Sequence, residues 1–391
     1  MSSNAITVKK ILIIATGPLK VFLYALPLIN TLNKYFKDVS IHVIVSPEHK
    51  KLASKYDSIT EIILDLKSNS FSRNLKNLVT CKKFIAAYNF DVIIFNQLDW
   101  FYVFIGFLAR IPLRIGHNYN VYLTYFLTHD VHLNQSAFTT HQADESLNLL
   151  KPLLNFWDAD VDFKFHVEES VLKKIKKIVS FNKDTKYILI DVEESQFFEQ
   201  WVKTNLNDLI KKVKLFDDCK FILVNSKLKF DSKEYEEDVF VEDIIVFEDK
   251  LTVEEKKALV QLVSMVIAHN TYILHIAVAL KKNVLMIKSA DKYTISKFNP
   301  WKTNHVIIEN NDTNGFGSNN ETTLINYMLS AIHFLLKNDI SFPKIQELYW
   351  FKINSNVLIH ISNKNKDEIR YLTKIIEILK KARYTLFDFN N

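Results

Sequence analysis

The chain has 391 residues, of which 48% are hydrophobic and 24% charged, so it is predicted to form two globular domains and not a disordered chain. Its five glycines are too few to build a G-x-G-x-x-G or Walker loop, which disfavours dinucleotide dehydrogenases and P-loop enzymes. The net charge of +6 is spread along the chain without a basic tract interleaved with aromatics, so we expect an anionic substrate or membrane surface and no nucleic acid.

Short apolar runs alternate with amphipathic stretches in the first part of the chain. Strands are predicted at 10–15, 40–45, 59–64 and 91–95, and helices at about 21–36 and 72–88. The strands are continuously apolar, which is typical of a parallel sheet covered by helices on both faces. A first α/β domain is therefore predicted over residues 1–165.

The same pattern restarts after this domain. Strands are predicted at 186–191, 220–224, 244–247, 265–268 and 283–287, and helices at 167–180, 205–216, 252–264 and 273–281. They predict a second α/β domain over residues 166–337. Two such domains in tandem place a ligand cleft between them, at the carboxyl ends of the strands.

Residues 338–391 are predicted to form a C-terminal extension. It contains a strand near 357–361 and a basic amphipathic helix near 366–383, and a loop is predicted before it at 308–320. The helix either packs across the domains with its basic face in solvent or touches a membrane surface.

Two further patterns bound the location and chemistry of the protein. The most apolar stretch, 100–113, is interrupted by Arg110 and is shorter than the roughly 20 residues that cross a bilayer, so we expect a cytoplasmic protein. Cys81 and Cys219 form no C-x-x-C pair, which indicates neither a zinc site nor a disulfide framework.

Residues 251–280 resemble glycosyltransferase family 9, the lipopolysaccharide heptosyltransferases. In that family a stretch written sL.el.aLi..a.l.v.nDSG..H.AaAl..P leads into a segment fGptdp…P. Residues 286–291 and 298–301 stand at the matching places of that second segment.

The first half of the chain resembles the same family independently. Residues 10–14 and 25–29 resemble its opening strand and alP.i..L helix, and residues 90–94 and 111–116 resemble its yDvvi…gi..RiG stretch. His141, ahead of a Leu-rich helix, resembles the family's entry to the linker. The resemblance covers about residues 8–310, and it is the order of the motifs that is specific.

The resemblance implies a GT-B fold, in which two Rossmann-like domains with parallel sheets face an interdomain cleft. A nucleotide-sugar, ADP-heptose by default, would bind the C-terminal domain, and an anionic glycolipid or glycan acceptor the N-terminal one. Known members invert the anomeric configuration without a metal, so no metal or other cofactor is expected. The implied function is sugar transfer to lipopolysaccharide or another bacterial surface glycan, in the cytoplasm or at the inner membrane.

The resemblance also marks positions where this chain departs from the family. An inverting transfer needs a base for the acceptor hydroxyl and cations or N–H groups for the departing diphosphate. Counting back from Pro27 places Val21 where the family has its Asp base, so either a gap shifts the alignment or that base is absent. Glu199, two residues before Trp201, stands where the family has a Lys. In the motif D-[ST]-G-x-x-H, Asn270 and Tyr272 replace the Asp and the Gly.

Asp99 and Glu193 are the candidates for a replacement base, because each follows a predicted strand. His117 is a further candidate in the first domain, where Arg114 is expected to fix a loop. The acids Asp191, Glu193 and Glu194 are either solvated loop residues, a substitute for the missing base, or a sign of a changed donor.

Contacts to the donor or substrate are predicted for Lys20, Asn270, Thr271, His275 and Lys288. Asn270 is expected to cap the following helix and to bind a sugar hydroxyl, and Tyr272 to crowd a phosphate at the helix N-terminus unless its ring turns away. His275 either contacts the ligand or is a buried structural histidine. Lys20 and Lys288 either neutralise a phosphate or are surface lysines.

These departures leave more than one function open. The first is a divergent family 9 glycosyltransferase. The second is a heptosyltransferase-like protein that has lost catalysis and serves as a binding or assembly component. The third is a GT-B enzyme with another donor that uses the acidic residues after Asp191. Binding of nucleotide-sugars separates these alternatives.

Overall fold

The structure is a computed structural model that describes residues 8–132, 140–163, 165, 167–192, 196–225, 243–247, 251–289, 296–310, 321–337 and 359–361. The chain forms two compact units. The first comprises Met1–His166 together with Ile295–Asn299, and the second comprises Val167–Thr294 and Pro300–Asn391. The chain therefore leaves the second unit, contributes a short segment to the first, and returns.

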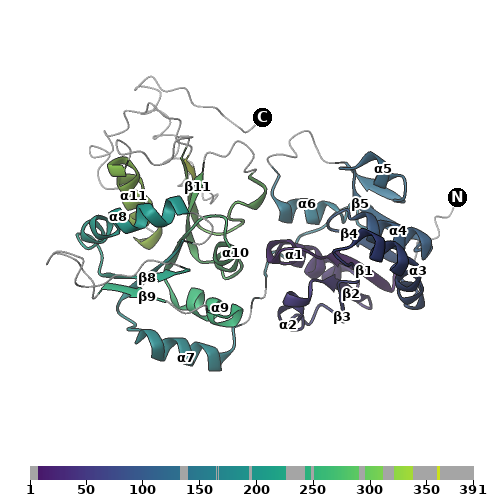
Figure 1. The fold of residues 1–391 in the computed structure, drawn as a ribbon, viewed down its shortest axis with the longest axis horizontal. Coiled ribbons are helices and arrows are strands. Elements are labelled where there is room, and N and C mark those ends of the chain that lie inside the picture. Colours follow the sequence, from purple (N-terminus) through teal and green to yellow (C-terminus); the bar gives the residue numbers. More distant parts are fainter. Residues whose placement is uncertain are drawn as a thin grey trace, which may run out of the picture. The chain divides into compact units, whose positions relative to one another are not determined.

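The first unit contains a sheet of six parallel strands in the order β3-β2-β1-β4-β5-β6. The strands are β1 (Lys10–Ala15), β2 (Ser40–Val45), β3 (Glu61–Leu64), β4 (Val92–Phe95), β5 (Leu113–His117) and β6 (His129–Val131). The helices around it (Figure 1) are α1 (Leu19–Tyr35), α2 (Lys50–Ala53), α3 (Phe71–Ala87), α4 (Trp100–Leu108), α5 (Val121–Thr124) and α6 (Gln142–Asn148), with a short 3-10 turn η1 (Pro47–His49).

The second unit contains a seven-stranded sheet in the order β13-β12-β11-β10-β7-β8-β9, parallel except for β13. The strands are β7 (Lys186–Asp191), β8 (Cys219–Val224), β9 (Ile244–Val246), β10 (Met265–Ala268), β11 (Asn283–Ser289), β12 (His305–Asn310) and β13 (Ile359–Ile361). The helices are α7 (Glu169–Val179), α8 (Gln196–Val213), α9 (Val253–Leu262), α10 (Tyr272–Ala279) and α11 (Glu321–Lys337); the turn η3 (Ser296–Phe298) belongs to the first unit.

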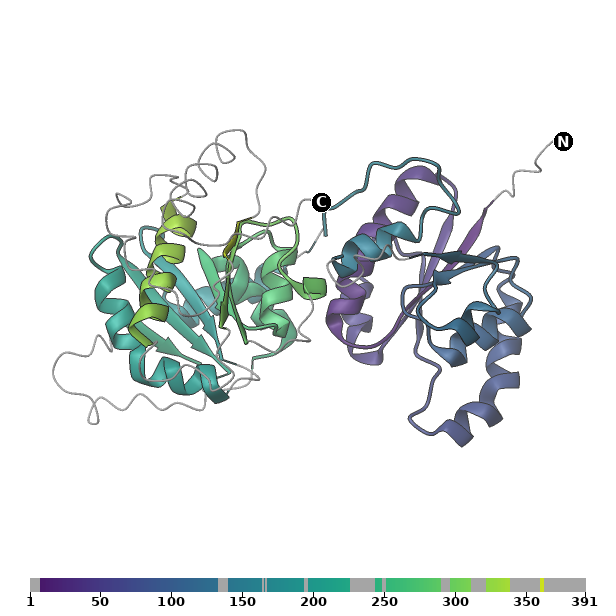
Figure 2. The same ribbon diagram turned by 90° about the horizontal axis from the view of Figure 1, so that it is seen from above.

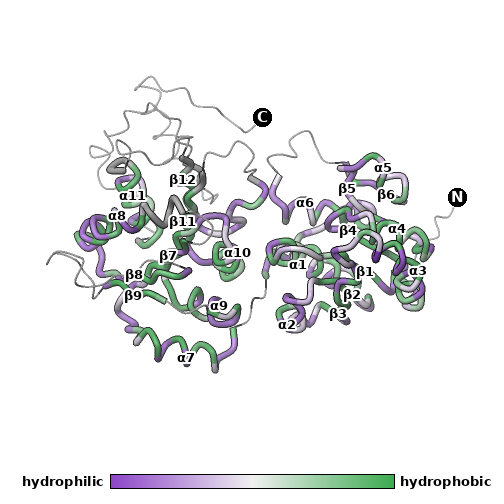
Figure 3. The backbone as a smooth tube through the Cα atoms, in the orientation of Figure 1, coloured by the Kyte–Doolittle hydropathy of each residue, from purple (hydrophilic) through white to green (hydrophobic). Residues whose placement is uncertain are grey.

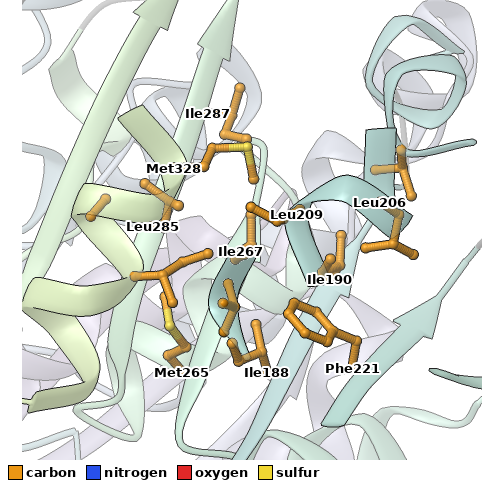
Figure 4. Close-up of a cluster of buried hydrophobic side chains, with 14 of the residues drawn as sticks. Ile188, Ile190, Leu206, Leu209, Phe221, Met265, Ile267, Leu285, Ile287 and Met328 are labelled. Carbon is orange, nitrogen blue, oxygen red and sulfur yellow. The ribbon is translucent and has the colours of Figure 1, made fainter. Parts of the chain in front are cut away.

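Both sheets are sandwiched between helices (Figure 2), which explains why their strands are apolar on both faces. In the second unit, α8 and α11 cover one face of the sheet, where Leu206, Leu209 and Met328 pack against strand residues such as Ile190 and Ile267 (Figure 4). The hydropathy colouring shows the same pattern, with hydrophobic strands and helices that are mostly hydrophilic on one side (Figure 3).

The predicted α/β class with two Rossmann-like parallel sheets is confirmed, but several element boundaries differ. β12 includes residues 308–310, which were expected in a loop, because the strand pairs in parallel with β11. α8 begins at Gln196 rather than 205, since Trp201 and Val202 continue the buried stripe of that helix. No element was predicted at α11, whose buried residues recur at helical spacing. The loop residues 311–320 and the predicted helix 366–383 lie outside the described residues.

The two sheets share one strand order, since β7, β8, β9, β10, β11 and β12 repeat the arrangement of β1 to β6. In such doubly wound sheets, ligands bind at the carboxyl ends of the two strands where the order reverses. We call the carboxyl ends of β1 and β4 the first switch point, and those of β7 and β10 the second switch point. Among the described residues, every helix is too short or too polar to span a bilayer.

Candidate functional site at the second switch point

A buried carboxylate, Asp191, lies at the second switch point. It is the last residue of β7, and it is fully buried between the neighbouring strands β8 and β10. Its two oxygens accept hydrogen bonds from Asn225 Nδ2 (2.7 Å) and Thr271 Oγ1 (2.6 Å). Asn225 has a positive φ of 57°, a conformation that Asn tolerates better than most residues. Asp191 is therefore not a solvated loop acid but an anchor for the ends of three strands.

Thr271 caps helix α10, and this corrects the expectation that Asn270 would do so. The Thr271 hydroxyl accepts from the backbone N–H of Leu274 while it donates to Asp191. The side chain of Asn270 turns instead to His275, whose Nε2 donates to Asn270 Oδ1 at 3.0 Å. His275 is buried, so it holds the loop before α10 in place. The residues of the altered D-[ST]-G-x-x-H motif thus form one connected group.

The ring of Tyr272 lies beside helix α9. Its centroid is 5.8 Å from Lys256 Nζ. Burial of the hydroxyl, together with the nearby charge of Glu254, raises the pKa of Tyr272 above its ordinary value, so the phenol stays neutral at physiological pH. The same helix carries Lys257, which is fully buried and pairs with Glu254 at 3.1 Å. Lys256 was not singled out in the sequence, because a lysine in an amphipathic helix resembles any solvated one.

The remaining predicted residues of this unit are only partly described. Lys288 lies in β11, opposite Glu309 of β12, and only its backbone is described. Glu193 lies outside the described residues, and the side chain of Glu199 does too. Trp201, two residues further along α8, is buried in the core of the second unit.

The first switch point is built around the turn between β1 and α1. Gly17 has φ of +103°, which favours glycine, and its N–H donates to Ser46 Oγ at 2.9 Å. His49 Nε2 lies 3.1 Å from the Gly17 carbonyl oxygen. Burial lowers the pKa of His49 below its ordinary value, with Glu48 opposing that shift, so the ring is neutral near pH 7. Val21, at the position where the resemblance predicts the base, is buried.

Lys20 lies in the first turn of α1 and faces an aromatic ring. Its Nζ is 4.1 Å from the centroid of Phe298, which belongs to the segment of residues 295–299. Lys20 therefore makes a cation–π contact with Phe298. The sequence did not predict this contact, because the two residues are far apart along the chain.

Asp99 starts helix α4. One carboxylate oxygen accepts from the Phe101 N–H at 2.9 Å, and the other forms an ion pair with Lys67. Both oxygens are thus engaged in holding the helix and the loop after β3. A role of Asp99 as a base stays a prediction, to which these contacts add no support.

His117 is buried at the end of β5, with Nδ1 3.4 Å from the Val131 carbonyl and Nε2 3.0 Å from the Glu145 carbonyl. Burial lowers the pKa of His117, so the ring is neutral, and both nitrogens face backbone oxygens. Arg114 donates to the carbonyls of Phe126 and Ile111, as expected for a residue that fixes a loop.

The segment of residues 295–299 is fastened to the first unit by an ion pair, hydrogen bonds and ring contacts. Lys297 Nζ lies 2.7 Å from the buried carboxylate of Glu145, which also accepts from Tyr119 Oη at 2.7 Å. His141 caps α6 by accepting from the Ala143 N–H, and its Nε2 donates to the Asn299 carbonyl at 2.9 Å. The contact between Lys20 and Phe298 adds to these. This segment falls where the resemblance placed the end of the fGptdp…P motif.

Glu48 is the residue that the sequence reasoning missed at this edge. It lies in the turn η1, three residues after the end of β2; its side chain is exposed, and its Oε1 lies 3.9 Å from His49 Nε2. The rule that singled out Asp99, an acid after a buried strand, would have found it. The described residues include no cluster of three or more His, Cys, Asp or Glu side chains placed to hold a metal ion.

A family model for glycosyltransferase family 9 (heptosyltransferase) matches residues 79–326, more than half of the chain. The chain therefore belongs to this family. No curated protein matches it by sequence.

Solved structures agree on the fold. A family 9 glycosyltransferase from Veillonella parvula superposes with a TM-score of 0.63 at 14% identity, over 86% of this chain and 100% of that one. The ADP-heptose lipopolysaccharide heptosyltransferase II of E. coli gives a TM-score of 0.58 at 14% identity, over 84% and 98%. E. coli heptosyltransferase WaaC with ADP gives 0.55 at 14% identity, over 83% and 99%. The fold is GT-B.

Proposed function

We propose that this protein is a glycosyltransferase that moves a sugar from a nucleotide-sugar to a surface glycan or glycolipid, with inversion and without a metal. ADP-heptose is the default donor, because the similar E. coli structures include one solved with ADP and one with ADP-2-deoxy-2-fluoro heptose. The proposal assigns the donor to the C-terminal domain, residues 166–337, and the acceptor to the N-terminal domain, residues 1–165. Lipopolysaccharide is the acceptor class that the family suggests.

The observation that carries the proposal is the position of the Tyr272 ring. A tyrosine in place of the family's glycine would obstruct a phosphate at the start of α10 if its ring lay over the helix N-terminus. The ring instead lies beside α9, near Lys256 and Glu254. The backbone N–H groups at the start of α10 keep the orientation in which helix N-termini bind phosphates.

The residues around this helix start supply the rest of the proposed donor site. Thr271 and Asn270 are held in place by Asp191 and His275, so the loop before α10 is ordered before any ligand arrives. Such preorganised groups stabilise the negative charge that develops on a departing diphosphate. Lys256 and Lys288 are the cations that we propose for its phosphates.

Three carboxylates are proposed for the role of the base. Asp99 and Glu193 are the predicted candidates. Glu48 is added because it is an exposed acid at the first switch point, next to the neutral His49. The base takes the proton of the acceptor hydroxyl as that oxygen bonds to the anomeric carbon and the nucleotide diphosphate leaves.

Titration calorimetry with ADP-, UDP-, GDP- and CMP-sugars tests the proposed donor site. We expect one nucleotide class to bind with a dissociation constant below about 1 mM, and Thr271→Val to weaken it by about tenfold through loss of the cap and of the Asp191 contact. Thr204→Val, on α8, is the matched control. If no nucleotide-sugar binds the folded protein, the enzyme proposal is wrong.

The inactive binding protein is the second candidate function, and the first switch point favours it. Val21 is buried where the family has its base, and both oxygens of Asp99 are engaged. Donor hydrolysis and transfer assays on Glu48→Gln, Asp99→Asn and Glu193→Gln distinguish the two. A protein that binds donor but turns over in none of these forms, including the wild type, is a binding component.

A further inference from the structure

An unusual surface of the first unit is made by the outward faces of α3, α4 and α5. We call it the α3–α5 patch, and its exposed hydrophobic residues are Phe71, Leu75, Val79, Phe107, Leu108, Val121, Tyr122 and Tyr125. Soluble proteins expose single hydrophobic side chains often, but contiguous exposed apolar surfaces mark interaction sites.

Helix α3 has two separate faces with hydrophobic residues, one buried and one exposed to solvent. Asn74, Cys81 and Ile85 are buried toward the sheet. Phe71, Leu75 and Val79 recur at four-residue spacing on a different face, and they are 63%, 50% and 61% exposed. This second stripe is not explained by packing within the described part of the chain.

Helix α4 continues the hydrophobic surface. Its sequence, WFYVFIGFL, has no charged residue, although a helix at a protein surface ordinarily presents a polar face to water. Phe107 and Leu108 are exposed, and the helix is mostly hydrophobic along its length (Figure 3). The only side chains of this helix with a polar atom are those of Trp100 and Tyr102, and of these two only Tyr102 is buried.

Ring contacts join the three helices into one surface. Phe71 of α3 lies 5.1 Å from Trp100 of α4, measured between ring centroids. Phe104 lies 4.6 Å from Phe126, two residues after the end of α5. Beside Phe126, Tyr122 and Tyr125 are both 81% exposed. Ring contacts therefore connect α3 to α4, and α4 to the end of α5.

The charge around the patch is mostly positive. Residues 66–129 contain seven Lys or Arg residues and two acids, Asp91 and Asp99. Asp91 accepts from the backbone N–H groups of Lys9 and Lys10, and Asp99 is paired with Lys67. Helix α3 carries only cations, namely Arg73, Lys76, Lys82 and Lys83.

We propose that the α3–α5 patch docks the protein on an anionic lipid bilayer. Exposed aromatic and aliphatic residues enter the interfacial region, where Trp and Tyr are favoured, and the cations of α3 contact anionic headgroups. An acidic protein would match the charge but does not require so many exposed rings. This surface is distinct from the basic helix predicted at 366–383, and the proposal does not depend on catalysis.

Flotation of the full chain with lipid vesicles tests the proposal. We expect binding to phosphatidylethanolamine vesicles with about 30% phosphatidylglycerol, little binding to phosphatidylcholine vesicles, and weakening in about 0.5 M salt. The double variant Leu75→Ser with Val79→Ser and the double variant Lys76→Glu with Lys83→Glu should each lower binding by about tenfold or more. Brominated lipids should quench the tryptophan fluorescence of the wild type, and they should quench that of Trp100→Phe to a smaller extent.

Matched controls lie on α7, which is also basic and amphipathic but exposes one hydrophobic residue, Ile178. Lys173→Glu with Lys177→Glu and, elsewhere, Leu215→Ser should leave vesicle binding within about twofold of the wild type. The proposal is overturned if the wild type does not bind anionic vesicles, or if the α7 variants lose as much binding as the α3 variants. It is also overturned if sedimentation shows a dimer that the α3 variants dissociate, because the patch is then an interface between copies. Donor-binding calorimetry on the same variants distinguishes a failure of the membrane-docking proposal from a failure of the proposed function, because only the second requires that the nucleotide-sugar does not bind.

Discussion

The two switch points of this protein differ in how their polar side chains are held. At the second, Asn270 and Tyr272 stand where the resemblance predicts an Asp and a Gly, and Asp191 and His275 hold the loop before α10. At the first, Val21 stands where the resemblance predicts an acid, it is buried, and nearby polar groups form structural contacts.

The difference shows that substitution at a motif does not by itself mean loss of a site. A carboxylate is absent at position 270, but a carboxylate at 191 contacts the next residue of the motif. The second switch point has therefore kept a polar, ordered loop next to a helix N-terminus. The first has the turn at Gly17, with Val21 at the position where an acid is predicted. Donor binding is expected to be the better preserved property. Four predictions test the contacts described in the two units, and the last of them also measures donor affinity.

The largest effect is expected for Asp191→Ala. It removes the carboxylate that accepts from the buried Thr271 hydroxyl and from the partly buried Asn225 amide, which should lower the free energy of unfolding by about 3 kcal/mol. Urea denaturation measures this, and Asp184→Ala, at an exposed position, should stay within about 0.5 kcal/mol of the wild type. A small effect of Asp191→Ala would mean that the second switch point is not held together as described.

Lys297→Met should have the next largest effect, now in the first unit. The Glu145 carboxylate is buried and would keep only Tyr119 as a side-chain donor, so we expect a loss of about 2 kcal/mol, discounted because the Lys297 side chain is partly exposed. Lys297→Met with Glu145→Gln should recover part of this loss. If the double variant is no more stable than the single one, the ion pair is not what fastens the 295–299 segment.

Acid should destabilise the first unit through its buried histidines. Burial lowers the pKa of His117 below its unfolded value of about 6.5, so between pH 7 and pH 5.5 the unfolded chain binds more protons at this residue than the folded state does. The stability that this residue contributes is therefore fully present above the unfolded pKa and is lost as the pH falls below it.

Urea unfolding of His117→Gln at the two pH values checks this expectation. The variant should lose less stability between pH 7 and pH 5.5 than the wild type does, whereas the exposed His132→Gln should follow the wild type. His42 and His49, whose pKa values burial also lowers, add to the same trend. An identical pH dependence in His117→Gln and wild type would contradict the assignment.

Lys20→Ala should have the smallest effect on stability. It removes the cation–π contact with Phe298, worth about 0.5 kcal/mol at a partly exposed site. Lys20→Met, which keeps the aliphatic stem against the ring, is the control. Thermal unfolding measures the change, and calorimetry with the donor sharpens the comparison. A tenfold loss of donor affinity in Lys20→Ala would show that the first switch point also serves the donor.

Much of the fold follows from local patterns. The runs at 10–15, 40–45, 186–191 and 265–268 coincide with strands, because continuous apolar runs bounded by polar residues are what a sheet covered on both faces requires. Family motifs in both halves led to the GT-B fold. The prediction was incomplete at α11 and at the start of α8. The hydrophobic residues there also recur at helical spacing, so the signal for these helices is local too.

The contacts of the candidate site depend on tertiary structure instead. Asp191 meets Asn225 and Thr271 only because β7 lies between β8 and β10, and no local pattern states which strands are neighbours. Likewise, Lys20 meets Phe298 because a short segment returns to the first unit. The sequence by itself determined the element types and the family, since these depend on periodicity and motif order. Only the tertiary structure decided which acids are buried anchors and which rings are left exposed, because burial depends on residues that are distant along the chain.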